Sequence, residues 1–140
     1  RVSGSRKLQL AFGRGHPRPL FKAAAPKVLL AGLPRPRLLE LHRQHAVQIA
    51  AHGLGDDWDA FRQYLAEIRR EGFYLSLGES EPGIAGAAMP VHNADGELVA
   101  ALALVGTEAA IRRAGRRRLV QWLGDGTARI EAALRAAPAR

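Results

Sequence analysis

The segment from Gly72 to Gly106 constrains the fold of this 140-residue chain more than any other stretch. It contains three apolar runs separated by turn-forming residues, and these runs are residues 73–77, 84–92 and 98–105. Pro82 and its neighbouring glycines interrupt the first two runs, because proline lacks an amide donor and glycine permits sharp bends. Asp95 and Gly96 supply the positive φ angles of a tight hairpin turn. The segment therefore predicts three strands, the last two forming a hairpin.

Small side chains dominate the two strands of this predicted hairpin. Residues 85–88 are all alanine or glycine, and three alanines lie between residues 100 and 103 on the strand opposite. Small residues on paired strands leave room above a sheet. Either a packed helix or a bound ligand can fill that room, and glycine within a strand often marks a close backbone approach in both cases. The residues alone leave both interpretations open.

Upstream of this segment the sequence predicts one strand and several helices. Apolar residues at spacings of three and four predict a helix over residues 58–71, capped by Asp56 or Asp57 and ended by Gly72. The pattern before it fits no single element over residues 42–55. The other expected elements are a strand at residues 8–12, a loop at 13–19, a helix from 24–26 to Gly32, and a short helix that opens at Pro34 and continues through Leu41.

The C-terminal part predicts a long, interrupted helix. We expect Thr107 to cap it, Gly115 to break it, and the helix to continue to about Ala136 with an irregularity at residues 124–126. Strands grouped together, with helices before and after them, are typical of an α+β fold with a largely antiparallel sheet. The chain has the length of one ordinary domain with a hydrophobic core.

Composition excludes several classes of protein. A hydrophobic content of 47% is typical of a globular domain. The absence of cysteine excludes a disulfide framework and a thiolate metal site. No apolar run approaches the roughly 20 residues that span a bilayer, and no secretory segment opens the chain. We therefore expect a cytoplasmic protein with no membrane association.

Candidate catalytic and metal-binding residues are few. His42 and His45 are three residues apart, but no HExxH motif or carboxylate cluster accompanies them, which favours surface or capping roles over metal binding. Glu79 and Glu81 could act as an acid and a base, but the sequence assigns no nucleophile beside them. A loop charge, or a role at the rim of a pocket, is the simpler interpretation. We expect no catalysis, no metal and no cofactor.

The net charge of +8 is concentrated in one cluster near the C-terminus. The cluster consists of Arg112, Arg113, Arg116, Arg117 and Arg118. On a helix such residues form a solvated basic face, and a basic face can also bind a polyanion such as nucleic acid. Because no aromatic residues are interleaved with these arginines, phosphate contacts would give affinity without sequence readout.

Several motifs together resemble the effector-binding domain of IclR-type bacterial transcriptional regulators. The longer motif comprises Gly72, Ser76, Gly78, Glu79, Gly83, Ala88, Pro90, Val91, Asp95, Gly96, Ala100, Ala101, Leu102 and Gly106. A second motif upstream comprises Gly15, Pro19, Leu20, Ala24, Lys27, Leu29, Leu30 and Ala31. Both motifs occur in the order and with the approximate spacing of that family.

This resemblance implies a GAF-like fold, in which helices flank a central antiparallel sheet. Residues 1–140 would then form an effector-binding domain without its first strands. In the family, a winged helix-turn-helix domain precedes the effector domain, and that DNA-binding part is absent from these residues. The resemblance further implies a small-molecule effector, DNA binding through the attached domain, and homodimers or homotetramers.

The resemblance also implies an effector site over the sheet. Carried over position by position, the candidate effector-binding residues are Pro19, Leu20, Ala24, Ala25, Ser76, Gly86, Ala103 and Val105. Family members often have cysteine or serine at the last three positions, so this pocket is expected to be more apolar. We expect an aromatic or carboxylic acid ligand, with Ser76, His16 or Arg18 at its anionic end.

Three alternatives to an open effector pocket remain at this level. Phe21 and Met89 could fill the pocket and leave a sensor without a ligand. The chain could instead be a basic nucleic-acid-binding module that acts directly through Arg112–Arg118. An enzyme that uses Glu79 and Glu81 is the third.

Overall fold

The computed structural model describes residues 2–3, 8–11 and 20–137. The strands are β1 Val2–Ser3, β2 Leu8–Ala11, β3 Tyr74–Leu77, β4 Ile84–His92 and β5 Leu98–Thr107. The helices are α1 Ala24–Ala31, α2 Arg35–Ala51, α3 Trp58–Glu71 and α4 Glu108–Ala136. None of these helices combines the length and the apolar character that crossing a membrane requires.

The five strands form one antiparallel sheet in the order β1-β2-β5-β4-β3. The hairpin predicted at Asp95-Gly96 joins β4 to β5, and Gly96 has a φ of 80° there. Across this hairpin Ala88 pairs with Ala103, as the small-residue pattern indicates. The predicted α+β class with an antiparallel sheet is confirmed.

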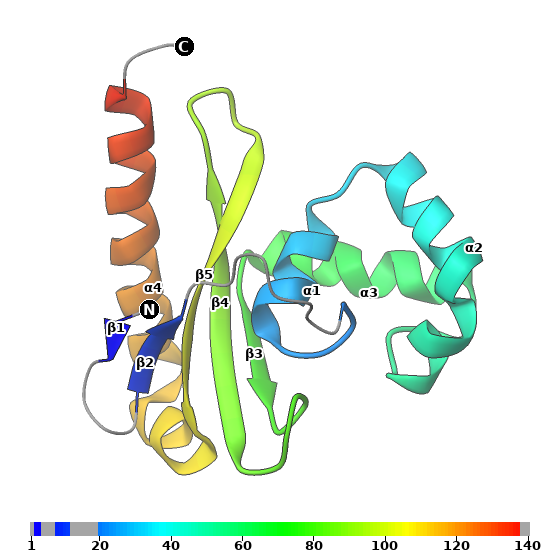
Figure 1. The fold of residues 1–140 in the computed structure, drawn as a ribbon, viewed down its shortest axis with the longest axis horizontal. Helices are drawn as coiled ribbons and strands as arrows, with labels where there is room; N and C mark the ends of the chain where they lie inside the picture. The colour runs from blue at the N-terminus through cyan, green and yellow to red at the C-terminus, as the bar shows by residue number, and fades with distance from the viewer. Residues whose placement is uncertain (1, 4–7, 12–19, 138–140) are drawn as a thin grey trace.

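Helices cover both faces of the sheet (Figure 1). Helix α4 packs on one face against β4 and β5, whereas α1 packs on the other face and α3 packs against α1. Helix α2 lies outside α3 and contacts it. Ala88 and Ala103 belong to the core beneath α1, and Ala85 and Ala87 belong to the core beneath α4. At these positions, helix packing accounts for the small side chains.

Two of the predicted helix starts are confirmed in detail. The side chain of Asp57 accepts a hydrogen bond of 2.8 Å from the Ala60 amide at the start of α3, and Thr107 accepts one of 3.0 Å from the Ala110 amide at the start of α4. The predicted break in α4 is also present, because Gly115 adopts φ 82° and ψ 156°.

The helices differ from the expectations in two places. The helix after Pro34 is not short: it continues through residues 42–51, which had no assignment, to form α2, although His45 departs from helical geometry. The irregularity expected at residues 124–126 does not occur, and α4 continues through both glycines. Burial of Leu123 and Thr127 around them offsets the cost of about 1 kcal/mol that glycine imposes on a helix.

Candidate functional site

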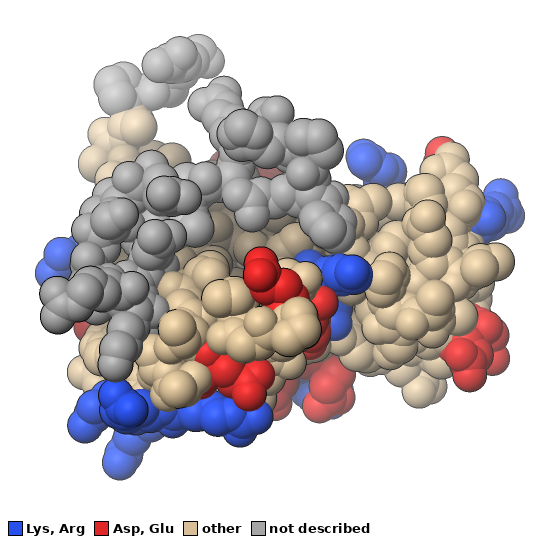
Figure 2. Space-filling model, turned by 60° about the horizontal axis from the view of Figure 1, so that its bottom comes forward, with Lys and Arg blue, Asp and Glu red and all other residues tan. Residues whose placement is uncertain are grey.

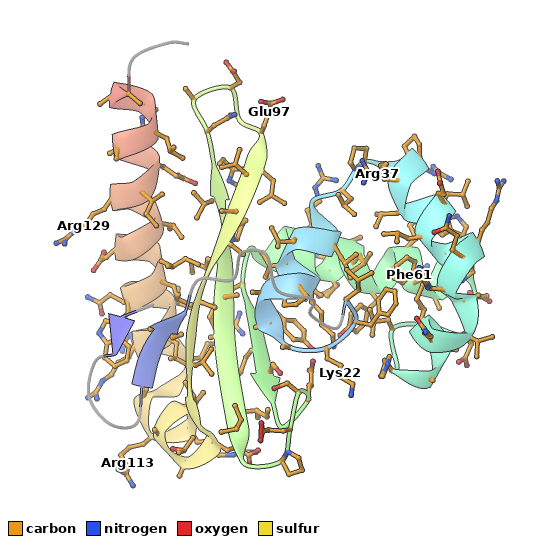
Figure 3. All side chains as sticks on the ribbon, in the orientation of Figure 1. Lys22, Arg37, Phe61, Glu97, Arg113 and Arg129 are labelled. Atoms are coloured by element: carbon orange, nitrogen blue, oxygen red, sulfur yellow. The ribbon has the colours of Figure 1, made fainter. Side chains whose placement is uncertain are left out.

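The arginine cluster forms a basic surface at the start of α4. Blue side chains gather at the lower left of Figure 2, and Figure 3 shows Arg113 pointing away from the molecule there. Arg112 lies 3.5 Å from the Glu108 carboxylate, and Arg116 lies 2.6 Å from Glu71 and over the ring of Phe73. The other three members, Arg113, Arg117 and Arg118, have no carboxylate within ion-pair distance among the described residues.

A network of four polar side chains lies on the opposite side of the sheet. The Lys27 ammonium donates hydrogen bonds to the hydroxyl oxygens of Tyr64, at 2.7 Å, and Tyr74, at 3.1 Å. It also forms an ion pair of 2.8 Å with Glu79 Oε1. The Tyr74 hydroxyl donates to Glu79 Oε2 at 2.5 Å and lies 3.0 Å from the Tyr64 hydroxyl. We call these four residues the lysine network.

Each member of the lysine network comes from a different part of the fold. Lys27 is on the buried side of α1, Tyr64 is on α3, and Tyr74 begins β3 on the face that α1 covers. The β3–β4 loop brings Glu79 back toward α1, because Gly78 has a φ of 74° that turns the chain after the strand. Residues far apart in sequence therefore converge on one buried ammonium group.

Loss of the Tyr74 proton is strongly disfavoured in this network. Tyr74 donates its only proton to Glu79, so Tyr64 donates to the Tyr74 oxygen and Lys27 donates to both hydroxyls. Burial, and then the hydrogen bonds with Glu79 and Tyr64, hold the pKa of Tyr74 well above its usual value. The charges of Lys27 and Glu79 balance, so the network is a neutral, hydrogen-bonded wall.

This wall borders a cavity of about 350 Å³. The other lining residues are Phe21, Lys22, His52 and Gly53. Lys22 projects from the segment before α1, close to the β3–β4 loop in Figure 3, and is half-buried. No carboxylate of the described residues pairs with it. The cavity therefore combines an aromatic ring, two phenols and an unpaired cation.

A second cavity, of about 230 Å³, lies at the other end of α1. Val28, Ile68 and Leu98 line it together with Gly32 and Gly72, the residues that end α1 and α3. Arg69 and His92 also line this cavity, beside the partial negative charge of the two helix C-termini. We place the candidate site at the larger cavity, because the lysine network converges on it.

Of the residues predicted for the effector site, those that the structure describes do not line this cavity. Ser76, Gly86 and Val105 form one row across β3, β4 and β5, on the same face as Tyr74. The remaining predicted residues differ in burial: Ala24 and Ala103 are in the core, Ala25 is half-buried, and Leu20 is 46% exposed. Pro19, His16 and Arg18 lie outside the described residues. The predicted list remains a prediction.

The structure contradicts the alternative in which two apolar side chains fill the pocket. Phe21 and Met89 cannot jointly fill a pocket, because Phe21 is in the core under α1, whereas Met89 packs on the α4 face of the sheet. Sequence reasoning missed Tyr64 and Tyr74 as site residues. In the described part of the chain, no three His, Asp or Glu side chains lie close enough together to hold a metal ion.

Comparison with protein families identifies the class of domain that this fold and cavity define. The family described as bacterial transcriptional regulator IclR, C-terminal, matches residues 1–132. The chain therefore belongs to the IclR family, and these residues form its C-terminal effector-binding domain. This is a family of regulators and not of enzymes, so the alternative of an enzyme using Glu79 and Glu81 is excluded. A search of curated protein sequences finds no significant match.

Solved structures agree with this assignment. A transcriptional regulator from Rhodococcus sp. RHA1 is 25% identical with a TM-score of 0.78, and the match covers 95% of this chain and 54% of that chain. An IclR-family regulator from Rhodococcus sp. is 30% identical with a TM-score of 0.65, covering 85% of this chain and 44% of that chain. This chain thus spans about half the length of these regulators.

The inducer-binding domain of Acinetobacter PobR, solved as a double mutant with 3-hydroxybenzoic acid, shares the fold. It is 24% identical with a TM-score of 0.67, and the match covers 81% of this chain and 67% of that chain.

Proposed function

We propose that this domain senses a small aromatic or carboxylic acid metabolite in the 350 Å³ cavity and thereby changes the operator affinity of an attached DNA-binding domain. The observation that carries the proposal is the combination of the cavity with its lining: Phe21, two tyrosines, and Lys22, which pairs with no carboxylate of the described residues. Its volume falls within the range of about 300–1,000 Å³ that is typical of small-molecule sites.

The chemistry of the wall supports this ligand class. The Phe21 ring and the faces of the tyrosines suit a flat or aliphatic body, and the two lining lysines, Lys22 and Lys27, attract an anionic end. The 3-hydroxybenzoic acid bound in the PobR domain is an aromatic carboxylic acid, and so belongs to this ligand class. We extend that chemistry to this chain as part of the proposal.

Regulation requires the ligand to prefer one of two arrangements of the whole protein. Such a preference is typically worth about 1–3 kcal/mol, and the same coupling must act in both directions between ligand and operator. We propose that the arrangements are those of a homodimer or homotetramer in the cytoplasm, with operator DNA held by the attached domain.

A thermal-shift screen tests the proposal. We expect one class among benzoate, hydroxybenzoates, aliphatic keto acids and sugar acids to stabilise the domain by about 2.7 kcal/mol at a ligand concentration of 100 Kd. Lys22→Gln should weaken binding of the acid, whereas Arg37→Gln, on the exposed surface of α2, should not. A cooperative melt that no acid shifts would contradict the proposal.

A further inference from the structure

We propose that Glu79 occupies the place of a ligand carboxylate, and that an acidic effector binds by replacing Glu79 at Lys27. This inference rests on the proposed function and names the contact by which the effector is recognised. The effector would then be a monocarboxylate whose anionic group reaches the lysine network, while its body fills the 350 Å³ cavity.

The two partners of this ion pair differ in how firmly the fold holds them. The Lys27 side chain is 4% exposed, whereas the Glu79 side chain is 27% exposed, and both line the cavity. A buried ammonium is costly without a counter-anion, so Lys27 must keep a carboxylate beside it. Nothing in that requirement specifies that the carboxylate belongs to the protein. Glu79 is the one carboxylate that supplies it among the described residues.

The chain around Glu79 permits its side chain to leave. Glu79 lies in the β3–β4 loop, between Gly78 with a φ of 74° and Gly83 with a φ of 85°. The backbone hydrogen bonds of this loop join Gly78 to Ile84 and Ile84 to Glu81, and none of them uses the backbone of Glu79. Releasing Glu79 therefore breaks its contacts with Lys27 and Tyr74 but leaves the sheet pairing intact.

The same loop is joined to α4 on the other face of the sheet. The Gly83 carbonyl accepts a hydrogen bond of 2.8 Å from the amide of Glu108, the first residue of α4, and Ile84 pairs with Thr107. A loop freed from α1 is thus still attached to the start of α4. Through this connection, a movement of the loop on ligand binding would be transmitted from the cavity to the opposite surface of the domain.

The proposed exchange restricts which chemical groups of a ligand can bind at Lys27. A neutral amide or alcohol cannot replace Glu79, because Lys27 would be left buried without a counter-ion. A carboxylate can, because one of its oxygens can form an ion pair with the ammonium, as Glu79 Oε1 does, and the other can accept from the Tyr74 hydroxyl, as Glu79 Oε2 does. Discrimination between an acid and its amide should therefore depend on Lys27.

Chemical rescue tests the site without knowledge of the natural effector. Glu79→Ala should lower Tm, and propionate, a small acid that carries the carboxylate the variant lacks, should restore several degrees. Propionamide should restore none. Glu81→Ala, in the same loop, is the matched control, because the Glu81 side chain is exposed. Propionate should not raise the Tm of this variant by more than it raises the Tm of the wild type. If propionate acts equally on both variants, Lys27 does not accept an external carboxylate and the inference is wrong.

Benzoate and benzamide test the exchange in the effector site itself. Glu79→Gln removes the competing anion, so it should bind benzoate about tenfold more tightly than the wild type does. Lys27→Met should lose the preference for benzoate over benzamide. In the wild type, saturating benzoate should speed hydrogen exchange in the segment 78–83 at its hydrogen-bonded amide, that of Gly78, since the loop loses its tether and opens more often.

These results separate the two proposals. If neither benzoate nor any other acid in the screen binds the wild-type domain, the proposed function fails. If an acid binds but Glu79→Gln does not tighten its binding and residues 78–83 become protected, the domain is a sensor but Glu79 is not exchanged. Should Lys27→Met fail to fold, the Glu79→Gln affinity and the exchange rates still decide the matter.

Discussion

At the residue scale, the candidate site depends on one buried cation and the three oxygen-bearing side chains around it. Most charges of this protein lie on its surface, where an ion pair contributes little to stability. Lys27 differs because burial makes its partners obligatory. Tyr64, Tyr74 and Glu79 satisfy it from three separate elements. The main consequence of this ion pair is that the cavity wall contains a buried ammonium group beside a carboxylate.

Because of Tyr74, the free energy of unfolding should decrease at alkaline pH. Burial first, and then its hydrogen bonds to Glu79 and Tyr64, hold the pKa of Tyr74 well above the usual 10.0, so the folded protein keeps a proton that the unfolded chain releases. Its contribution is full below about pH 10 and is lost as pH rises further, by up to about 1.4 kcal/mol per pH unit. Urea unfolding from pH 8 to pH 11 measures this slope. Tyr74→Phe should reduce the slope, and an equal slope in both proteins would contradict the assignment.

At the scale of elements, α4 contains three glycines in three different environments. Gly115 breaks the helix with a positive φ and with ψ near 156°, a region open essentially to glycine alone. Gly124 is helical, and a methyl group added to it would meet no neighbouring element within 4 Å, whereas a methyl group at Gly126 would meet Leu102 Cδ2 at 2.6 Å. One helix thus contains a glycine required by its backbone, one required by its neighbour, and one that neither requires.

Alanine substitutions at these three positions should therefore differ in sign. Gly115→Ala should destabilise the domain by about 1–3 kcal/mol, since the break would be strained. Gly124→Ala should stabilise it by about 0.5–1 kcal/mol, because alanine loses less backbone entropy in a helix. At Gly126 the contact with Leu102 should turn that gain into a loss of about 1–3 kcal/mol. Chemical unfolding of the three variants gives the order directly, and a stabilising Gly115→Ala would show that the break is dispensable.

Elements set by local signals could be predicted from the sequence, and those set by tertiary contacts could not. The Asp95-Gly96 turn, the Asp57 cap and the break at Gly115 each depend on neighbouring residues alone. Helix α2 extends to Ala51 because Ile49, which is fully buried, packs in the core with α3, a contact that no local pattern shows.

The same distinction applies to the candidate site. The resemblance to the family drew attention to Lys27 and Glu79 as motif positions, but not to their contact. Tyr64 lies 37 residues from Lys27 in the sequence, and Tyr74 lies 47 residues away. Only the packing of α1 against α3 and the sheet brings them together. Periodicity and motif spacing describe neighbours along the chain. They therefore do not predict which distant polar side chains meet in one buried cluster.

At the scale of the whole molecule, the sheet separates two surfaces with different chemistry. The face covered by α1 holds the cavity and the neutral lysine network, and the face covered by α4 leads to the basic surface at residues 112–118. The β3–β4 loop contacts both, through Lys27 on one side and Glu108 on the other. This loop is the path by which the proposed exchange of carboxylates would reach the second surface.

The basic surface predicts how this domain behaves toward nucleic acid when it is alone. Arg113, Arg117 and Arg118 are the members without an ion-pair partner in the described structure, so roughly three phosphates are neutralised. Counterion release then gives a slope of about −2.7 in the logarithm of affinity against the logarithm of salt concentration, or about a 40-fold loss between 50 and 200 mM salt. Fluorescence anisotropy with duplexes of unrelated sequence should show this weak binding equally for each duplex.

Replacing all three of these arginines by glutamine should abolish the salt dependence, whereas Arg129→Gln with Arg135→Gln, exposed on the same helix, should leave most of it. A preference for one duplex sequence would overturn this expectation, because phosphate contacts carry no sequence information. Such a preference would favour the alternative of a module that binds nucleic acid directly. Without it, these residues contact nucleic acid through phosphates alone, and the proposed attached domain would supply the sequence readout.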